Sequence, residues 1–189
     1  GDEWRQFTYN QGQSSRAVFA GGYAPGPSYT KQTSISSVII TSTGNAVEFG
    51  DLVAPARTDH AAMSSSTRGV WHQSIGSPAE GQSLDYVALA SGGKAEDFGD
   101  LFNVRTRTSA LSSSTRGLIV GGYTHPARIN AIDYIQISTK GTAKDFGDVE
   151  QNSLRPAPVA SPTRGVFVGG RNRTPGSRTD AISVVTISS

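Results

Sequence analysis

The chain has 189 residues, no cysteine and a formal net charge of +2. The absence of cysteine excludes disulfides, thiolate nucleophiles, Cys-ligated zinc and iron–sulfur clusters. The nearly balanced charge, with arginines at fixed repeat positions, argues against a nucleic-acid binder, and no apolar stretch approaches the ~18 residues that membrane insertion requires. Abundant Ser, Thr and Gly without an amphipathic helical pattern predict an all-β protein with many tight turns.

One phrase recurs four times along the chain. It reads SSSTRGV from Ser64, SSSTRGL from Ser112 and SPTRGV from Ser161, with a looser version, QSSRAV, from Gln13. The arginines of the four copies are separated by 52, 48 and 48 residues; they are Arg16, Arg68, Arg116 and Arg164. A Gly-Asp pair recurs with the same period, so the chain is an internal repeat of about 48 residues.

Each copy predicts strands in the same order. The first is a short apolar run ended by glycine, as in GLIVGG (117–122), which suits a strand covered on both faces. The second is an alternating segment such as AIDYIQI (131–137), and the third is AVEFGD, AEDFGD or AKDFGD, with one Phe as its apolar anchor. The turn between the second and third carries Gly44, Gly93 or Gly141, which supplies the positive φ of a tight hairpin.

A fourth strand is expected near the end of each copy, at Arg57–Ala62, Arg107–Leu111 and Arg155–Ala160. Pro156 and Pro158 cannot donate to a ladder, so this strand should lie at a sheet edge. Repeats of 40–50 residues with three or four short antiparallel strands are typical of β-propeller blades, whose apolar faces pack against neighbouring blades.

The sequence therefore predicts one domain, 1–189, folded as a small all-β propeller of about four blades. The expected blades are 14–62, 64–111, 112–160 and 161–189, the last completed by residues 1–13. The opening GDEW matches the chain from Gly147 onward, so the two ends are expected to share a blade and close the ring. Because residue 1 is Gly rather than Met, we expect a processed, excised or incomplete chain.

The repeat resembles the kelch repeat. Glycine doublets at 21–22, 121–122 and 169–170 match its first signature, and Tyr86 and Tyr134 match its next aromatic, whereas His72-Gln73 replaces the doublet in the second copy and Phe replaces the kelch Trp. The repeat sequence resembles more closely the Ser/Thr/Gly-rich arrays in tail-fibre or capsid-appended proteins of tailed bacteriophages that infect marine bacteria. This resemblance implies a non-enzymatic protein of the virion surface, extracellular, that binds other virion proteins or host cell-surface polysaccharide; a homo-oligomer is left open.

Two other functions fit the same scaffold: a secreted lectin-like propeller, and a hydrolase or oxidase. No catalytic residue, cofactor or metal is predicted. The acidic pairs Glu96/Asp97 and Asp145/Asp148 recur from copy to copy, whereas a glycosidase needs its carboxylate pair once. The three histidines, His60, His72 and His125, occupy different repeat positions without ligand spacing.

The four repeat arginines recur together with Asp51, Asp100 and Asp148. This predicts a structural Arg–Asp network that ties strand ends or neighbouring blades, because Arg binds carboxylates in bidentate geometry. The alternative is a ring of arginines that binds an anion in a central channel.

The segments that follow each doublet position differ in length and content, at 23–34, 74–83, 123–130 and 171–179. Loops at equivalent repeat positions emerge on one face, and loops on a rigid scaffold carry function. Aromatic rings can stack on sugars and Arg can bind carboxylates or phosphates, which makes the loop residues candidate ligands. They are Tyr23, Tyr29, Lys31, Tyr123, His125, Arg128, Arg171, Arg173 and Arg178. The alternative is ordinary solvated loops or a contact with another virion protein.

Overall fold

The computed structural model describes residues 15–24, 30–53, 58–74, 81–171 and 178–187. In these residues the chain forms β-strands and turns and no helix, which confirms the all-β prediction. The described residues therefore contain no helix that is long and apolar enough to span a membrane.

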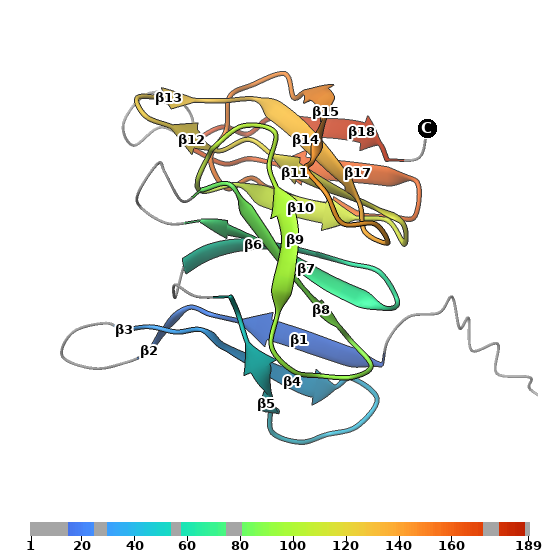
Figure 1. The fold of residues 1–189 in the computed structure, drawn as a ribbon. Helices are drawn as coiled ribbons and strands as arrows, with labels where there is room; N and C mark the ends of the chain where they lie inside the picture. Colours follow the sequence, from blue (N-terminus) through green and yellow to red (C-terminus); the bar gives the residue numbers. More distant parts are fainter. Residues whose placement is uncertain (1–14, 25–29, 54–57, 75–80, 172–177, 188–189) are drawn as a thin grey trace, which may run out of the picture.

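Four antiparallel sheets, called sheets I to IV, follow one another along the chain and lie as a stack (Figure 1). Sheet I contains β1 (Arg16–Ala20), β4 (Ser34–Ile39) and β5 (Val47–Asp51). Sheet II contains β6 (Thr58–Ser64), β7 (Arg68–Ser74), β8 (Ser83–Ala88) and β9 (Glu96–Asp100). Sheet III contains β10 (Ser109–Ser112), β11 (Arg116–Val120), β14 (Ala131–Gln136) and β15 (Lys144–Asp148). Sheet IV contains β16 (Ala157–Ala160), β17 (Arg164–Val168) and β18 (Ile182–Thr186). Two short ribbons pair β2 (Tyr23–Ala24) with β3 (Thr30–Lys31) and β12 (Tyr123–Thr124) with β13 (Ala127–Arg128).

The sheets are offset from the sequence repeats by one strand. The predicted fourth strands exist as β6, β10 and β16, and each is an edge strand, but each pairs with the first strand of the following copy. The predicted blade boundaries placed them at the end of the preceding blade. The reason is local: only three residues separate β6 from β7, and a hairpin between adjacent strands needs no long connection.

The Ser of the repeated phrase holds this hairpin turn. Ser65 Oγ accepts hydrogen bonds from the Thr67 and Arg68 N–H groups, at 3.2 and 3.1 Å. Ser113 and Ser161 do the same for Arg116 and Arg164, each at 3.0 Å. The hydroxyl replaces a backbone acceptor in the turn.

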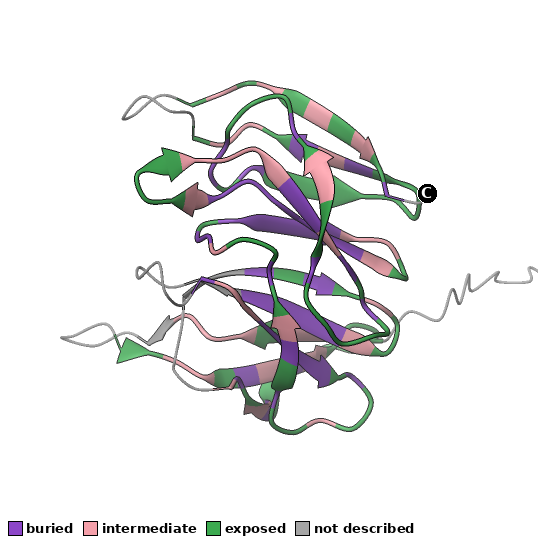
Figure 2. Ribbon diagram, turned by 45° about the horizontal axis from the view of Figure 1, so that its top comes forward, coloured by how far each residue is buried: buried purple, intermediate pink, exposed green. Residues whose placement is uncertain are grey.

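The hydrophobic core lies between the sheets rather than within one of them. In β8, Leu84 and Tyr86 pack toward sheet III, whereas Val87, and Leu89 just after the strand, pack toward sheet I. Sheets III and IV share a third cluster, and Figure 2 shows the buried ribbon concentrated in the middle sheets. The apolar layers between blades that the sequence predicted are therefore present between consecutive sheets.

In sheets III and IV, the glycine that follows the repeat Arg lies where a side chain of the preceding sheet crosses the strand; in sheet II, Gly69 instead lies under Trp71 of its own strand. A Cβ on Gly117 would overlap Met63 Sδ, and one on Gly165 would lie 2.7 Å from a Leu111 methyl. In β1 the same position is Ala17, and no described sheet covers that side of sheet I. This explains why the first copy of the phrase reads RA rather than RG.

No described segment covers the two ends of the stack. Phe19 on sheet I is 59% exposed and Ile182 on sheet IV is 65% exposed, although their equivalents in sheets II and III are buried. A four-blade ring closed on itself would bring these faces together, and in Figure 1 they lie at opposite ends. The described residues form an open stack, and the predicted completion of the last blade by 1–13 falls outside them.

Candidate functional site

The repeat arginines join consecutive sheets through backbone carbonyls. Arg16, Arg68 and Arg116 each donate from Nη1 to a carbonyl of the next sheet, at 2.9, 3.1 and 2.9 Å; the acceptors are Leu89, Ile137 and Ile187. Each guanidinium also lies over an aromatic ring of its own sheet, at 5.4, 4.9 and 4.9 Å from the centroid; the rings are Phe49, Tyr86 and Tyr134. An aromatic ring and the repeat Arg thus form one contact at each inter-sheet boundary, although the ring comes from the third strand of the repeat in sheet I and from the second strand of the repeat in sheets II and III.

The contacts of these three arginines are to backbone carbonyls and aromatic rings, whereas the sequence predicted contacts to aspartates. The arginines do tie neighbouring sheets, through carbonyls and π faces. Asp51 accepts a hydrogen bond from the Thr33 hydroxyl at 3.1 Å, and an ionic role for Asp100 and Asp148 stays a prediction. Arg164, in the last sheet, is exposed.

The turn of each middle sheet also pairs with the outer strand of the sheet before it. Gly141 N–H and Ala143 N–H donate to the carbonyls of Phe98 and Asp100 in β9, at 2.8 and 2.7 Å. The turn of sheet II makes the same two bonds to β5. The backbone comes so close that a Cβ on Gly99, whose φ is +139°, would overlap the Gly141 carbonyl.

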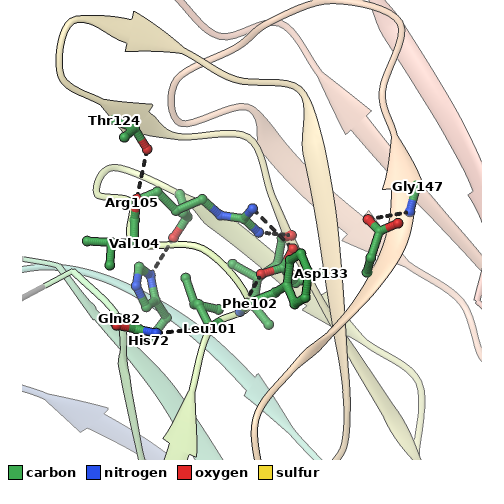
Figure 3. A network of polar contacts seen from close by, with 12 residues as sticks. His72, Gln82, Leu101, Phe102, Val104, Arg105, Thr124, Asp133 and Gly147 are labelled. Carbon is green, nitrogen blue, oxygen red and sulfur yellow. Dashed lines mark hydrogen bonds and ion pairs between the residues drawn. The ribbon is translucent and has the colours of Figure 1, made fainter.

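A buried ion pair joins sheets II and III. Arg105 Nη1 lies 3.1 Å from Asp133 Oδ1, with side chains 0% and 1% exposed, and Arg105 Nη2 donates to the Ile119 carbonyl at 3.0 Å (Figure 3). Asp133 Oδ2 accepts from Phe102 N–H at 3.1 Å. Burial raises the pKa of Asp133, and the Arg105 charge opposes this shift. Sequence analysis missed this pair, which the repeat signals only as Arg five residues after Asp100 and Asp before Tyr134.

His72 has a structural role. It is fully buried in β7, where its Nδ1 lies 2.7 Å from Thr108 Oγ1 and its Nε2 lies 3.0 Å from the Gly81 carbonyl. A neutral imidazole that donates from Nε2 and accepts at Nδ1 fits both partners. The strand registers align His72 with Val120, because His72 pairs with Leu84 and Val120 with Ile132. Gln73-Ser74, rather than the predicted His72-Gln73, therefore occupies the position of the glycine doublet.

A cavity of about 660 Å³ runs beside the inner edge strands and receives residues from all four sheets. Its walls include β6, β10 and β16, the Ser-rich turns and the start of β1. Ser112 Oγ both accepts from Ser64 N–H and donates to Ser64 O, at 3.1 and 3.0 Å, which fixes adjacent edges. Among the described residues Arg16 lines this cavity and the other repeat arginines do not, which disfavours the alternative of an arginine-lined channel.

The loop residues occupy the opposite end of the strands from these turns. The ribbons β2–β3 and β12–β13 project from the same side of the stack in Figures 1 and 2, with sheet II between their levels. Lys31 is exposed on the lower ribbon. Tyr23 lies in β2, and Tyr29 and Arg173 fall outside the described residues.

The upper ribbon and the segment before β10 bring together aromatic and basic side chains, here called the Tyr123 cluster: Arg107, Tyr123, His125 and Arg128. Tyr123 pairs with Arg128 across the ribbon. The Arg107 guanidinium lies 5.6 Å from the Tyr123 ring centroid, and the His125 ring meets the same ring edge-on at 6.1 Å. Nη1 of Arg128 is shielded from solvent and has no hydrogen-bond partner among the described residues.

The backbone anchors the Tyr123 cluster to the scaffold. Tyr123 and Thr106 exchange backbone hydrogen bonds at 3.0 and 2.8 Å, and Thr124 Oγ1 donates to the Val104 carbonyl at 2.7 Å. Arg107 has a backbone φ of +58°, which residues other than Gly rarely adopt. Such backbone conformations are often found at binding sites. Sequence analysis missed Arg107, which it assigned to the start of a strand.

The next sheet repeats this anchoring with more arginines. Arg155, at the position of Arg107, has φ of +49° and donates its N–H to the Arg107 carbonyl at 3.2 Å. Arg171 bridges both Leu154 and Arg178. The structure therefore brings the predicted Tyr123, His125 and Arg128 together, adds Arg107, and places Arg171 and Arg178 on the neighbouring sheet.

One residue of the predicted acidic pairs, Glu96, has two side-chain partners. Glu96 accepts from Tyr86 Oη and from Lys140 Nζ, each at 2.8 Å, and the Lys140 contact is the first cause of its lowered pKa. Within the described residues no group of three His, Asp or Glu side chains is arranged to hold a metal ion. A scan against protein-family models and a search of curated proteins both found no match to this chain.

Proposed function

We propose that the protein is a non-enzymatic binding protein of a virion surface, which attaches through the Tyr123 cluster to acidic polysaccharide on a host cell. In this proposal the four sheets are propeller blades that fan about an axis along the cavity they all line. The particle location rests on the resemblance of the repeat to phage tail-fibre and capsid-appended proteins.

The observation that carries the ligand class is the arrangement of donors around Tyr123. A half-buried aromatic ring offers a stacking face for a sugar, and Arg128 offers a shielded Nη1 with no described partner beside it. Arg107 and Arg128 present planar forks that fit a uronate carboxylate or a sulfate. The left-handed backbone conformation of Arg107 and the hydrogen bonds of the β12–β13 ribbon hold these groups on a rigid sheet. Binding then costs less conformational entropy.

The first test is calorimetric titration of the 189-residue chain with acidic and neutral bacterial polysaccharides. We expect binding of the acidic polymers alone, weakened by added salt because charged contacts are screened. Tyr123→Ala and Arg128→Gln should each weaken binding by about tenfold, the loss expected for about 1.4 kcal/mol of stacking or charge-assisted hydrogen bonding.

The matched control is Lys94→Gln. It removes the same charge as Arg128→Gln from an exposed turn at the other end of the strands. Equal weakening by both variants would show nonspecific attraction and contradict the proposed site. Particle location is tested separately, by labelling intact virions with an antibody against the chain.

A further inference from the structure

The two ends of the stack expose faces that are buried everywhere else in the molecule. On sheet IV the face pointing away from sheet III carries Val166, Val168, Ile182 and Val184. Their equivalents on sheet III are Leu118, Val120, Ile132 and Tyr134, which pack against sheet IV. Ile132 is 1% exposed, against 65% for Ile182.

Sheet I exposes the other half of the same interface. Its uncovered face carries Phe19, Val38 and Ile40, together with Ala46 in the following turn. Their equivalents on sheet II are Trp71, Val87, Leu89 and Ala95, which pack against sheet I. Trp71 is 4% exposed, against 59% for Phe19.

The polar groups at the two ends match in the same way. Arg164 is exposed and is the sheet IV equivalent of Arg116, which donates to the Ile187 carbonyl of the next sheet. On sheet I, the carbonyl equivalent to that of Ile187 is the carbonyl of Ile40.

We propose that these faces bind each other between two copies of the chain, head to tail. Sheet I of one copy takes the place after sheet IV of another, with Phe19 on the Val166–Ile182 face. Arg164 then donates to the Ile40 carbonyl, as Arg116 donates to the Ile187 carbonyl within the chain. The interface repeats the apolar packing and the Arg-to-carbonyl contact that join consecutive sheets within the chain.

A head-to-tail contact closes into a ring or grows into a filament, depending on the rotation at each step. Since all four sheets line one cavity, the stack curves about an axis, and we expect a closed ring. Two copies supply eight sheets, which is within the size of known propeller rings of about four to eight blades.

The test is the mass of the 189-residue chain in solution, measured by sedimentation over a wide concentration range. We expect twice the 19.8-kDa mass of one chain as concentration rises. Phe19→Asp and Ile182→Asp, each on one end face, should both leave a monomer. Both side chains are exposed in the single chain, so circular dichroism should show an unchanged fold.

Mixing the two variants distinguishes head-to-tail binding from other modes. Phe19→Asp retains an intact sheet IV face and Ile182→Asp an intact sheet I face, so the mixture should form one interface and a 1:1 pair. Phe102→Asp is the control, since Phe102 is 57% exposed but lies on the loop after β9. A wild-type chain that stays monomeric, variants that keep the wild-type mass, or a mixture without pairs would each overturn the proposal.

Discussion

At the scale of single residues, the recurring Arg acts as a hook between sheets. It stacks on an aromatic ring of its own sheet and donates to a carbonyl of the next, a geometry that Lys, as a compact point charge, does not reproduce. The hook explains why the phrase STRG recurs: the Ser closes the turn, the Arg reaches across, and the Gly leaves room for the side chain that crosses it.

Replacing Arg116 with Leu should lower the free energy of unfolding by about 1–2 kcal/mol, because a charge-assisted hydrogen bond and a cation–π contact are lost together. Chemical denaturation in the Phe19→Asp background, which keeps the sheet IV face free of a second copy, measures this. Arg164→Leu in the same background should change stability by less than about 0.5 kcal/mol. Equal effects of the two variants would contradict the hook.

Glu96 gives stability a dependence on pH. Lys140 lowers the pKa of Glu96, so the folded state binds its proton less readily than the unfolded chain does. Its contribution is therefore present above the ordinary pKa of 4.5 and is lost as pH falls through the lowered value. Glu96→Gln should be less stable than wild type at neutral pH, and thermal melts should converge in acid. A constant difference across pH would rule out the carboxylate as the cause.

At the scale of sheets, the interfaces are alike in shape but not in chemistry. Sheets II and III are joined by Arg105 and Asp133, whereas Ser153 and Ser183 stand at the equivalent positions of sheets III and IV. A buried ion pair is costly to break from one side, because the remaining charge has no partner.

Asp133→Ser should destabilise the fold by about 3–5 kcal/mol, since it leaves the buried Arg105 charge unpaired. The double variant Arg105→Ser/Asp133→Ser should be less destabilised than the sum of the two single changes. A double-mutant cycle from urea denaturation measures this coupling, and additive effects would show that the two charges do not interact.

Close packing over glycine gives a second test at this scale. Gly117→Ala should cost about 1–3 kcal/mol, because the new methyl group overlaps Met63 Sδ. In a Met63→Ala background the same change should cost much less. A cost that is equal in both backgrounds would place its origin in the backbone rather than in this contact.

The sequence predicted the strands and the packing layers of the sheets, but it missed the strand offset and two side-chain pairs. Strand order, edge strands and apolar layers follow from the repeat, because each copy must bury the same columns. The strand offset was missed because periodicity does not say which side of a repeat boundary a strand joins. Arg105 with Asp133, and Arg107 with Tyr123, were missed because each pair lies far apart in sequence and in different repeat positions. That Tyr123, His125 and Arg128 lie near one another was predicted, because a short loop keeps them together, and their role in ligand binding stays a prediction.

At the scale of the whole molecule, each hydrophobic cluster of the described residues joins two consecutive sheets, so stability should be distributed as in a linear array. Sheets II and III are covered on both faces, and sheets I and IV on one. We expect hydrogen exchange to be slower in β7, β8, β11 and β14 than in β1, β4, β17 and β18. Mass spectrometry of exchanged peptides measures this. If two copies associate, the terminal strands should gain protection with concentration, and uniform protection in the Phe19→Asp monomer would refute the linear picture.

The displaced edge strand changes what counts as a transferable module. A cut placed at the start of the STRG phrase divides β6 from β7 or β10 from β11, and so separates the two arms of a hairpin. A cut after the Gly-Asp pair, between β9 and β10, keeps every hairpin whole. Swapping, duplicating or grafting a module should therefore succeed when the cut follows the Gly-Asp pair, and should yield insoluble product when the cut precedes STRG. The sequence repeat alone would suggest the cut before STRG.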